Sequence, residues 1–167
     1  VLSMLLAPLL IRYNGRIVKR LVPAYRERRE SNLDSIRSAS SHAHGHVILC
    51  GYGRSGQNIA WMLKKENVPT LGLDLDPVRV RDARDAGEQV VYGDSARRDV
   101  LLAAGLMQAR ALIISFVDPT VAFRILSATR DLRPDMPVIV RTIDDRDMEE
   151  LKKAGATEVV PESLEGS

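Results

Sequence analysis

Short apolar runs alternate with stretches of helical periodicity along the chain from His46 to its end. Such runs, bounded by turn residues, are typical of strands in a parallel sheet, because helices cover both faces of that sheet. The predicted strands are Val47–Cys50, Thr70–Leu73, Gln89–Tyr92, Ala111–Phe116, Val138–Arg141 and Glu158–Val160. Because Ala111–Phe116 is the most apolar run, we expect it at the centre of the sheet.

The segments between these runs carry apolar residues at helical spacing. Proline at the start or glycine at the end marks several of their boundaries. Helices are predicted over Gln57–Glu66, Pro77–Gly87, Arg97–Ala104, Pro119–Asp131 and Asp145–Ala154. The strict alternation of strands and helices predicts an α/β domain over residues 46–167, with a Rossmann-type, doubly wound parallel sheet of six strands.

The first 23 residues have a different pattern. Residues 1–11 are apolar at nine of eleven positions, and basic residues follow directly. The run is shorter than the ~20 residues of a membrane-spanning helix, so we expect the sequence to be a fragment that begins inside such a helix. Residues 1–23 are then the helix end and a basic juxtamembrane segment on the cytoplasmic side of the inner membrane. The alternative is an amphipathic helix on a membrane surface.

Residues 24–45 lose this periodicity and are rich in serine, which predicts a linker. His42, His44 and His46 alternate there, but no cysteine or second cluster supplies further ligands, so we do not expect a metal site. Cys50 is the single cysteine, which excludes an internal disulfide, and its strand position predicts a buried structural thiol.

Charge is distributed unevenly along the chain. Residues 12–30 contain seven arginines and lysines against two glutamates, while the whole chain has a net charge of +2, so the predicted domain is slightly acidic. An acidic domain disfavours nucleic acid as its main partner. Aromatic residues make up 4% of the chain, which also argues against base stacking.

A glycine-rich sequence, Gly51-Tyr52-Gly53-Arg54-Ser55-Gly56, follows the first predicted strand and opens the first predicted helix. The first glycine permits a tight turn, the second lets a pyrophosphate approach the backbone, and the third lets helix and strand pack closely. Free amides at the helix N-terminus then favour phosphate. In this strand–loop–helix context the sequence predicts a nucleotide site.

Charged and hydroxyl side chains near this loop complete the predicted site. Asp74 ends the second strand and is expected to accept hydrogen bonds from ribose hydroxyls, with Asp76 as the alternative acceptor. A carboxylate there repels a 2′-phosphate, so NAD(H), AMP, ADP or ATP is favoured over NADP. Arg54 either neutralises a phosphate or is an exposed surface arginine. Asp94 and Ser95 face the adenine or its ribose, cap a helix, or do both.

Residues for acid–base catalysis are not apparent. The predicted domain has no histidine after His46, and no Ser-His-Asp set stands out. We therefore expect a binding module rather than an enzyme. The alternative from another class is a fragment of an NAD-dependent oxidoreductase, since the same glycine loop serves nicotinamide enzymes.

Three sequence blocks resemble the TrkA-N, or RCK, domain of potassium transport systems: the Gly51–Gln57 loop, Leu73–Pro77 and Val91–Ser95. The segments Arg130–Arg141 and Ala154–Glu162 are also similar to that family. Together with the apolar start, the chain looks most like the cytoplasmic part of a Kef-type monovalent cation:proton antiporter. The resemblance implies nucleotide binding, a homodimer formed through this domain, and gating of a membrane transport domain in the same chain. A peripheral Trk-type potassium uptake subunit is a further alternative.

Overall fold

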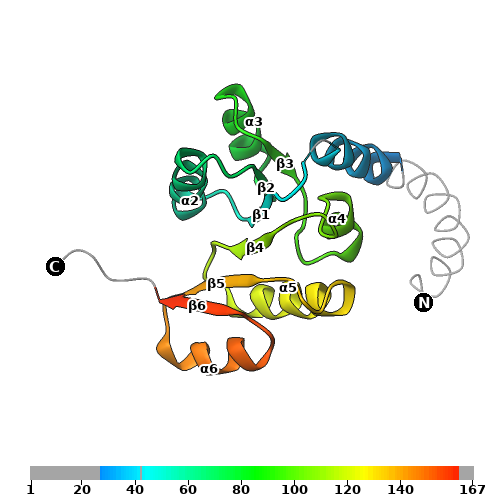
Figure 1. The fold of residues 1–167 in the computed structure, drawn as a ribbon. Coiled ribbons are helices and arrows are strands. Elements are labelled where there is room, and N and C mark those ends of the chain that lie inside the picture. The colour runs from blue at the N-terminus through cyan, green and yellow to red at the C-terminus, as the bar shows by residue number, and fades with distance from the viewer. Residues whose placement is uncertain (1–26, 42, 162–167) are drawn as a thin grey trace, which may run out of the picture.

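The computed structural model describes residues 27–41 and 43–161 and shows an open, all-parallel sheet of six strands (Figure 1). The strands lie in the order β3-β2-β1-β4-β5-β6, which confirms the doubly wound topology. They are β1 (Val47–Cys50), β2 (Thr70–Asp74), β3 (Val90–Tyr92), β4 (Ala111–Ile114), β5 (Val138–Thr142) and β6 (Glu158–Pro161). The apolar strand β4 lies at the centre beside β1, as predicted.

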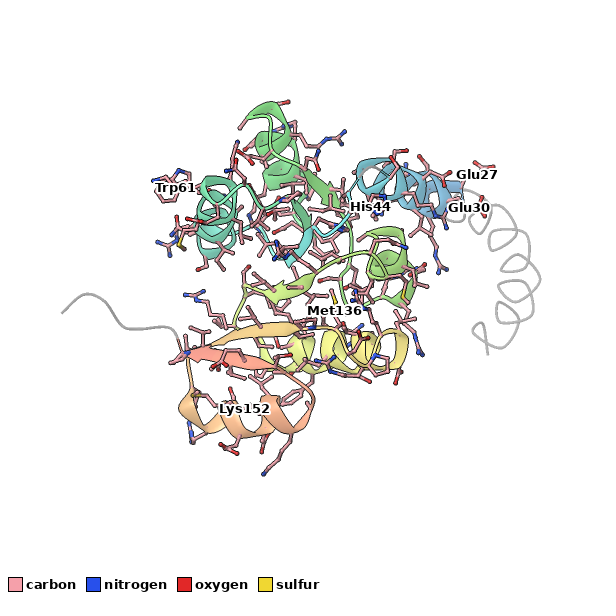
Figure 2. The ribbon with its side chains drawn as sticks, in the orientation of Figure 1. Glu27, Glu30, His44, Trp61, Met136 and Lys152 are labelled. Carbon is pink, nitrogen blue, oxygen red and sulfur yellow. The ribbon has the colours of Figure 1, made fainter. Side chains whose placement is uncertain are left out.

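Helices cover the two faces of the sheet unequally (Figure 1). They are α2 (Arg54–Lys65), α3 (Pro77–Asp85), α4 (Arg98–Ala103), α5 (Pro119–Leu132) and α6 (Asp145–Lys153). The core between α2, α3 and the sheet is the smaller one and contains Leu49, Ala60 and Val80. The larger core, under α4, α5 and α6, contains Leu101 and Leu126 and also Met136, which Figure 2 labels.

Local signals set most element boundaries. The N-caps of α3, α5 and α6 are Asp76, Asp118 and Asp144, and each carboxylate accepts a backbone amide of the first turn. The clearest shift from the predicted boundaries is at α2, which begins at Arg54 rather than Gln57 because the helix starts inside the glycine loop.

Residues 27–40 form a helix, here called the leading helix, where the sequence predicted a linker without helical periodicity. Its apolar residues Leu33, Ile36 and Ala39 recur every three positions and pack on the larger core. Ile36 is completely buried. This apolar stripe is narrow and lies among serines and charged residues, so the helical periodicity of the sequence is weak. The helix is therefore stabilised mainly by its packing on the sheet.

Polar contacts join the leading helix to α4. Arg29 donates to the Asp99 carboxylate through Nη2 at 2.5 Å, and the Ser40 hydroxyl donates to the Ala103 carbonyl at 2.7 Å. Burial raises the pKa of Asp99, but hydrogen bonds from Arg29 and Arg97 outweigh that effect, and the net pKa is lowered. At the other end of the segment, His46 is buried and its Nε2 lies 2.8 Å from the Ala104 carbonyl.

The predicted membrane-helix end and basic segment, residues 1–23, lie outside the described residues, as does His42. Within 27–41 and 43–161, no helix combines the length and the hydropathy that crossing a bilayer requires.

Candidate functional site

A pocket of about 450 Å³ opens at the carboxyl ends of the strands, where β1 and β4 lie side by side and the chain changes direction across the sheet. Ligands of doubly wound sheets bind in this crevice, and the volume is within the usual range for small-molecule sites. The lining residues are Gly51, Gly53, Arg54, Ser55, Gly56, Leu73, Asp74, Leu75, Arg79, Gly93, Asp94, Ser95, Ser115, Phe116, Val117, Val121 and Arg141.

Two glycines of the loop are required by the fold itself. Gly51 has φ +93°, a conformation that favours glycine, and its amide donates to the Leu73 carbonyl at 2.8 Å. Gly56 lies so close to β1 that a Cβ atom there would be 2.2 Å from the Gly51 carbonyl oxygen. Both glycines therefore keep α2 tight against the sheet, as the spacing of the motif predicted.

Gly53 is different, because the protein does not require a glycine there. Its φ is −67°, which any residue adopts, and a Cβ atom would have no neighbour within 4 Å. Gly53 also lines the pocket, so a side chain there would occupy open space at the pocket wall. A glycine that neither backbone conformation nor packing requires is expected where a ligand approaches the backbone.

The N-terminus of α2 faces the same pocket. No side chain caps it at Gly53, whereas aspartates cap α3, α5 and α6. The first-turn amides of a helix have no carbonyl acceptor within the helix, so they are available to an anion. Arg54 is exposed in this first turn and also lines the pocket.

Asp74 lies at the pocket wall with its side chain 6% exposed. Its Oδ2 accepts the Tyr52 amide at 2.6 Å, and its Oδ1 accepts the Asp76 amide at 2.8 Å. Arg79, on α3, reaches both oxygens through Nη1 at 2.9 Å. The sequence predicted the carboxylate here but gave no indication of its arginine partner.

Asp94 and Ser95 also line the pocket, at the end of β3. The Asp94 carboxylate accepts the Ala96 amide at 3.0 Å, so it stabilises the turn before α4, although the helix N-cap is Arg97. Ser95 is buried and hydrogen-bonds to the Cys50 thiol. Burial raises the pKa of Cys50 to about 12, because the opposing effect of the Ser95 hydrogen bond is smaller. Cys50 is thus a buried neutral thiol, as expected from its strand position.

Two predicted site residues do not line this pocket. The Tyr52 ring packs in the core between α2, α3 and the sheet. This residue is linked to the site by the hydrogen bond that its backbone amide donates to the Asp74 carboxylate. Asp76 caps α3 by accepting the amides of Val78 and Arg79. Both Tyr52 and Asp76 line a neighbouring hollow that contains Trp61, Asp82 and Glu88.

Ser115, Phe116 and Arg141 are among the pocket residues, besides Arg79, that the sequence did not predict. Ser115 follows β4 and its hydroxyl donates to the Gly51 carbonyl at 2.9 Å, which fixes the glycine loop. Phe116 follows it, and Arg141 lies near the end of β5 with Nη1 3.2 Å from the Ser115 carbonyl oxygen. The strand order of a doubly wound sheet could have identified Ser115 and Phe116, because β4 ends next to β1.

A larger groove of about 860 Å³ lies between the leading helix and the β3 edge of the sheet. Four of its lining side chains are carboxylates, those of Glu27, Glu30, Asp34 and Glu88, against a single arginine, Arg84. Its volume exceeds that of the pocket at the glycine loop, but its carboxylates repel a phosphate group. The smaller pocket is therefore the better candidate for an anionic ligand.

Comparison with known proteins identifies the sequence family. The model of the TrkA-N domain matches residues 47–162. A K(+) efflux antiporter KefB from Alkalimonas amylolytica is 45% identical over 165 residues, which cover 98% of this chain and 25% of that protein. The chain thus spans about a quarter of the length of this curated relative.

Solved structures agree with this result. The TrkA-N domain of the inner membrane protein ybaL from Escherichia coli superposes with a TM-score of 0.68 at 27% identity, covering 72% of this chain and 90% of that chain. The Kef CTD of Shewanella denitrificans, in its AMP-bound form, has a TM-score of 0.63 and 31% identity, with 71% and 72% of the two chains covered.

Proposed function

The chain belongs to the TrkA-N domain family, and from that premise we propose that it binds an adenine nucleotide and thereby gates a potassium:proton antiporter of the Kef type. The relative named as a K(+) efflux antiporter and the AMP-bound Kef CTD support this proposal. AMP, ADP, ATP and NAD(H) are the candidate ligands. The observation that carries the proposal is Gly53, whose missing side chain leaves open space in the pocket.

The residues of the pocket fit such a ligand. The 5′-phosphate would lie at Gly53, against the uncapped amides of α2 and the Arg54 guanidinium, since helix N-termini and arginine both favour phosphate. The ribose would lie against Asp74, and the base beyond it near Asp94 and Ser95. These assignments use five of the predicted residues that line the pocket: Gly53, Arg54, Asp74, Asp94 and Ser95.

Coupling to a membrane domain would pass through the leading helix. A Cβ atom on Gly93, which lines the pocket just before Asp94, would lie 3.2 Å from Ile36 Cδ1. A ligand that moves this loop therefore acts directly on the helix that follows the basic segment. Such a ligand shifts the gate only if the domain has two arrangements and the ligand binds them with different affinities. The basic residues 12–30 support a position at the cytoplasmic face of the inner membrane.

We further propose that the domain binds rather than transforms its ligand. Among the described residues that line the pocket there is no histidine or cysteine, the common groups for proton transfer and nucleophilic attack. The relatives named as a K(+) efflux antiporter and as a Kef CTD support a regulatory role.

A homodimer through this domain is also part of the proposal. Parallel sheets are normally covered on both faces, yet Val160 of β6 is 46% exposed and Ile139 of β5 is half-buried on the face that carries α2. A second copy of the chain would cover this half of the sheet, hereafter the open face.

Isothermal titration calorimetry with AMP, NAD and ATP tests nucleotide binding. We expect wild-type protein to bind, Gly53→Ala to bind more weakly, and Gly53→Val to give no heat, because the added atoms fill the phosphate position. The free energy of unfolding of the ligand-free variants should differ from that of wild type by about 1 kcal/mol, the typical effect of a poorer N-cap residue. Wild type without heat, or Gly53→Val with unchanged affinity, would overturn the proposal.

A further inference from the structure

The Asp74 carboxylate, to which the ribose is assigned, already has a full set of partners within the protein. The amides of Tyr52 and Asp76 and the guanidinium of Arg79 together make four contacts with its two oxygens. A carboxylate offers about four acceptor positions. A ribose hydroxyl can therefore donate to Asp74 only when one of these partners withdraws.

Arg79 is the partner that can withdraw. The two amides belong to the backbone next to the ends of β1 and β2, whereas the Arg79 side chain is 39% exposed and lines both the nucleotide pocket and the neighbouring hollow. Its Nη2 lies 3.3 Å from Asp76 Oδ2, and the hollow also contains the carboxylates of Asp82 and Glu88. The guanidinium can thus turn from Asp74 toward the hollow and keep an acidic partner.

We propose that Arg79 occupies the ribose position on Asp74 and determines the specificity of the site at the 2′ carbon. This inference rests on the proposed nucleotide binding. Arg79 competes with the ribose hydroxyls for Asp74, so it lowers the affinity for nucleotides with a free 2′-hydroxyl. Once displaced, its charge lies beside the 2′ position, so the site accepts a 2′-phosphate that Asp74 alone repels.

Adenosine 2′,5′-bisphosphate is the matched probe, because it differs from AMP by the 2′-phosphate alone. Calorimetry with both ligands is carried out on wild type, Arg79→Met and Arg79→Lys. Methionine keeps much of the side-chain stem and removes the charge and the donors. We expect Arg79→Met to bind AMP about fivefold more tightly and the bisphosphate about tenfold more weakly, as for one charge-assisted hydrogen bond at a partly exposed site.

Arg79→Lys keeps a positive charge and is expected to retain bisphosphate binding within about threefold. The control variant is Arg81→Met on the same helix; the Arg81 side chain is 67% exposed and its Nη2 lies 3.4 Å from Asp82 Oδ1. It should leave both affinities within about twofold, because exposed ion pairs contribute little.

The ratio of the two affinities decides the result. Opposite changes in Arg79→Met support the proposal. Equal weakening of both ligands means that Arg79 only attracts anions, and an unchanged ratio means that it does not contact the 2′ position; either result overturns the inference while nucleotide binding stands. Wild type that binds neither ligand overturns the proposed function first, and the role of Arg79 with it.

Discussion

At the scale of single residues, three glycines of one motif are present for three different reasons. Gly51 is required by its positive φ, Gly56 by the close approach of α2 to β1, and Gly53 by neither. Within six positions, the same residue type thus serves backbone conformation, packing and, in the proposed nucleotide site, access of a ligand. Because only the third reason concerns a ligand, substitutions at Gly53 and Gly56 separate binding from folding.

Gly56→Ala is expected to destabilise the fold. Its Cβ would lie 2.2 Å from the Gly51 carbonyl oxygen, a backbone atom that cannot move without displacing the loop from the sheet. We expect the free energy of unfolding to fall by about 3 kcal/mol, the upper range for overpacking. Urea unfolding of Gly56→Ala and Gly53→Ala in parallel measures the difference; equal losses in the two variants would contradict it.

At the scale of elements, the leading helix is the part of the described chain that depends most on its neighbours. It is joined to the domain by Ile36, which is fully buried, and by polar contacts to α4. Its own sequence, rich in serine and charge, gives little intrinsic helical stability. Docking and helix formation are therefore expected to be lost together.

Ile36→Ala tests this dependence. The substitution leaves a cavity in the larger core, and large-to-small changes at buried isoleucines cost about 2–5 kcal/mol. Hydrogen exchange should accelerate across residues 27–40 and much less in β1 and β4. Asp34→Ala, at an exposed position of the same helix, serves as the control and should leave exchange unchanged. Uniform acceleration throughout the domain would show that the helix unfolds only with the sheet.

At the scale of the whole molecule, the two faces of the sheet differ in cover. The leading helix, α4, α5 and α6 cover one face completely, while α2 and α3 leave the open face at β5 and β6 (Figure 1). Trp61, which Figure 2 labels, is 58% exposed on α2, the helix on that face. This asymmetry is the reason for expecting a partner copy there.

Val160→Lys is expected to convert the proposed dimer to a monomer, because it places a charge on the open face. Leu102→Lys is the matched control, since Leu102 is 48% exposed on α4, on the other side of the sheet, against 46% for Val160. Size-exclusion chromatography with light scattering gives the mass of each variant. A dimer that survives Val160→Lys, or that Leu102→Lys also dissociates, would place the interface elsewhere.

Much of the fold could be predicted because it depends on local patterns. The apolar runs identified every strand of the described sheet, and the glycine loop and Asp74 identified the edge at which the pocket lies. The leading helix was missed because its three apolar residues form too narrow a stripe to recognise without the surface on which they pack. Tyr52 and Asp76 were predicted in the pocket, but the Tyr52 ring packs in the core and the Asp76 carboxylate caps α3.

The sequence alone determined the order of strands and helices, the glycine loop and the acidic residue that ends β2, because these depend on periodicity and on neighbours along the chain. Only the tertiary structure decided that Arg79 reaches Asp74, that Ser115 fixes the loop, and that Ile36 lies next to Gly93. The last two contacts join residues more than fifty positions apart, and the first depends on how α3 is oriented against β2. Such contacts follow from packing, which a linear pattern does not encode.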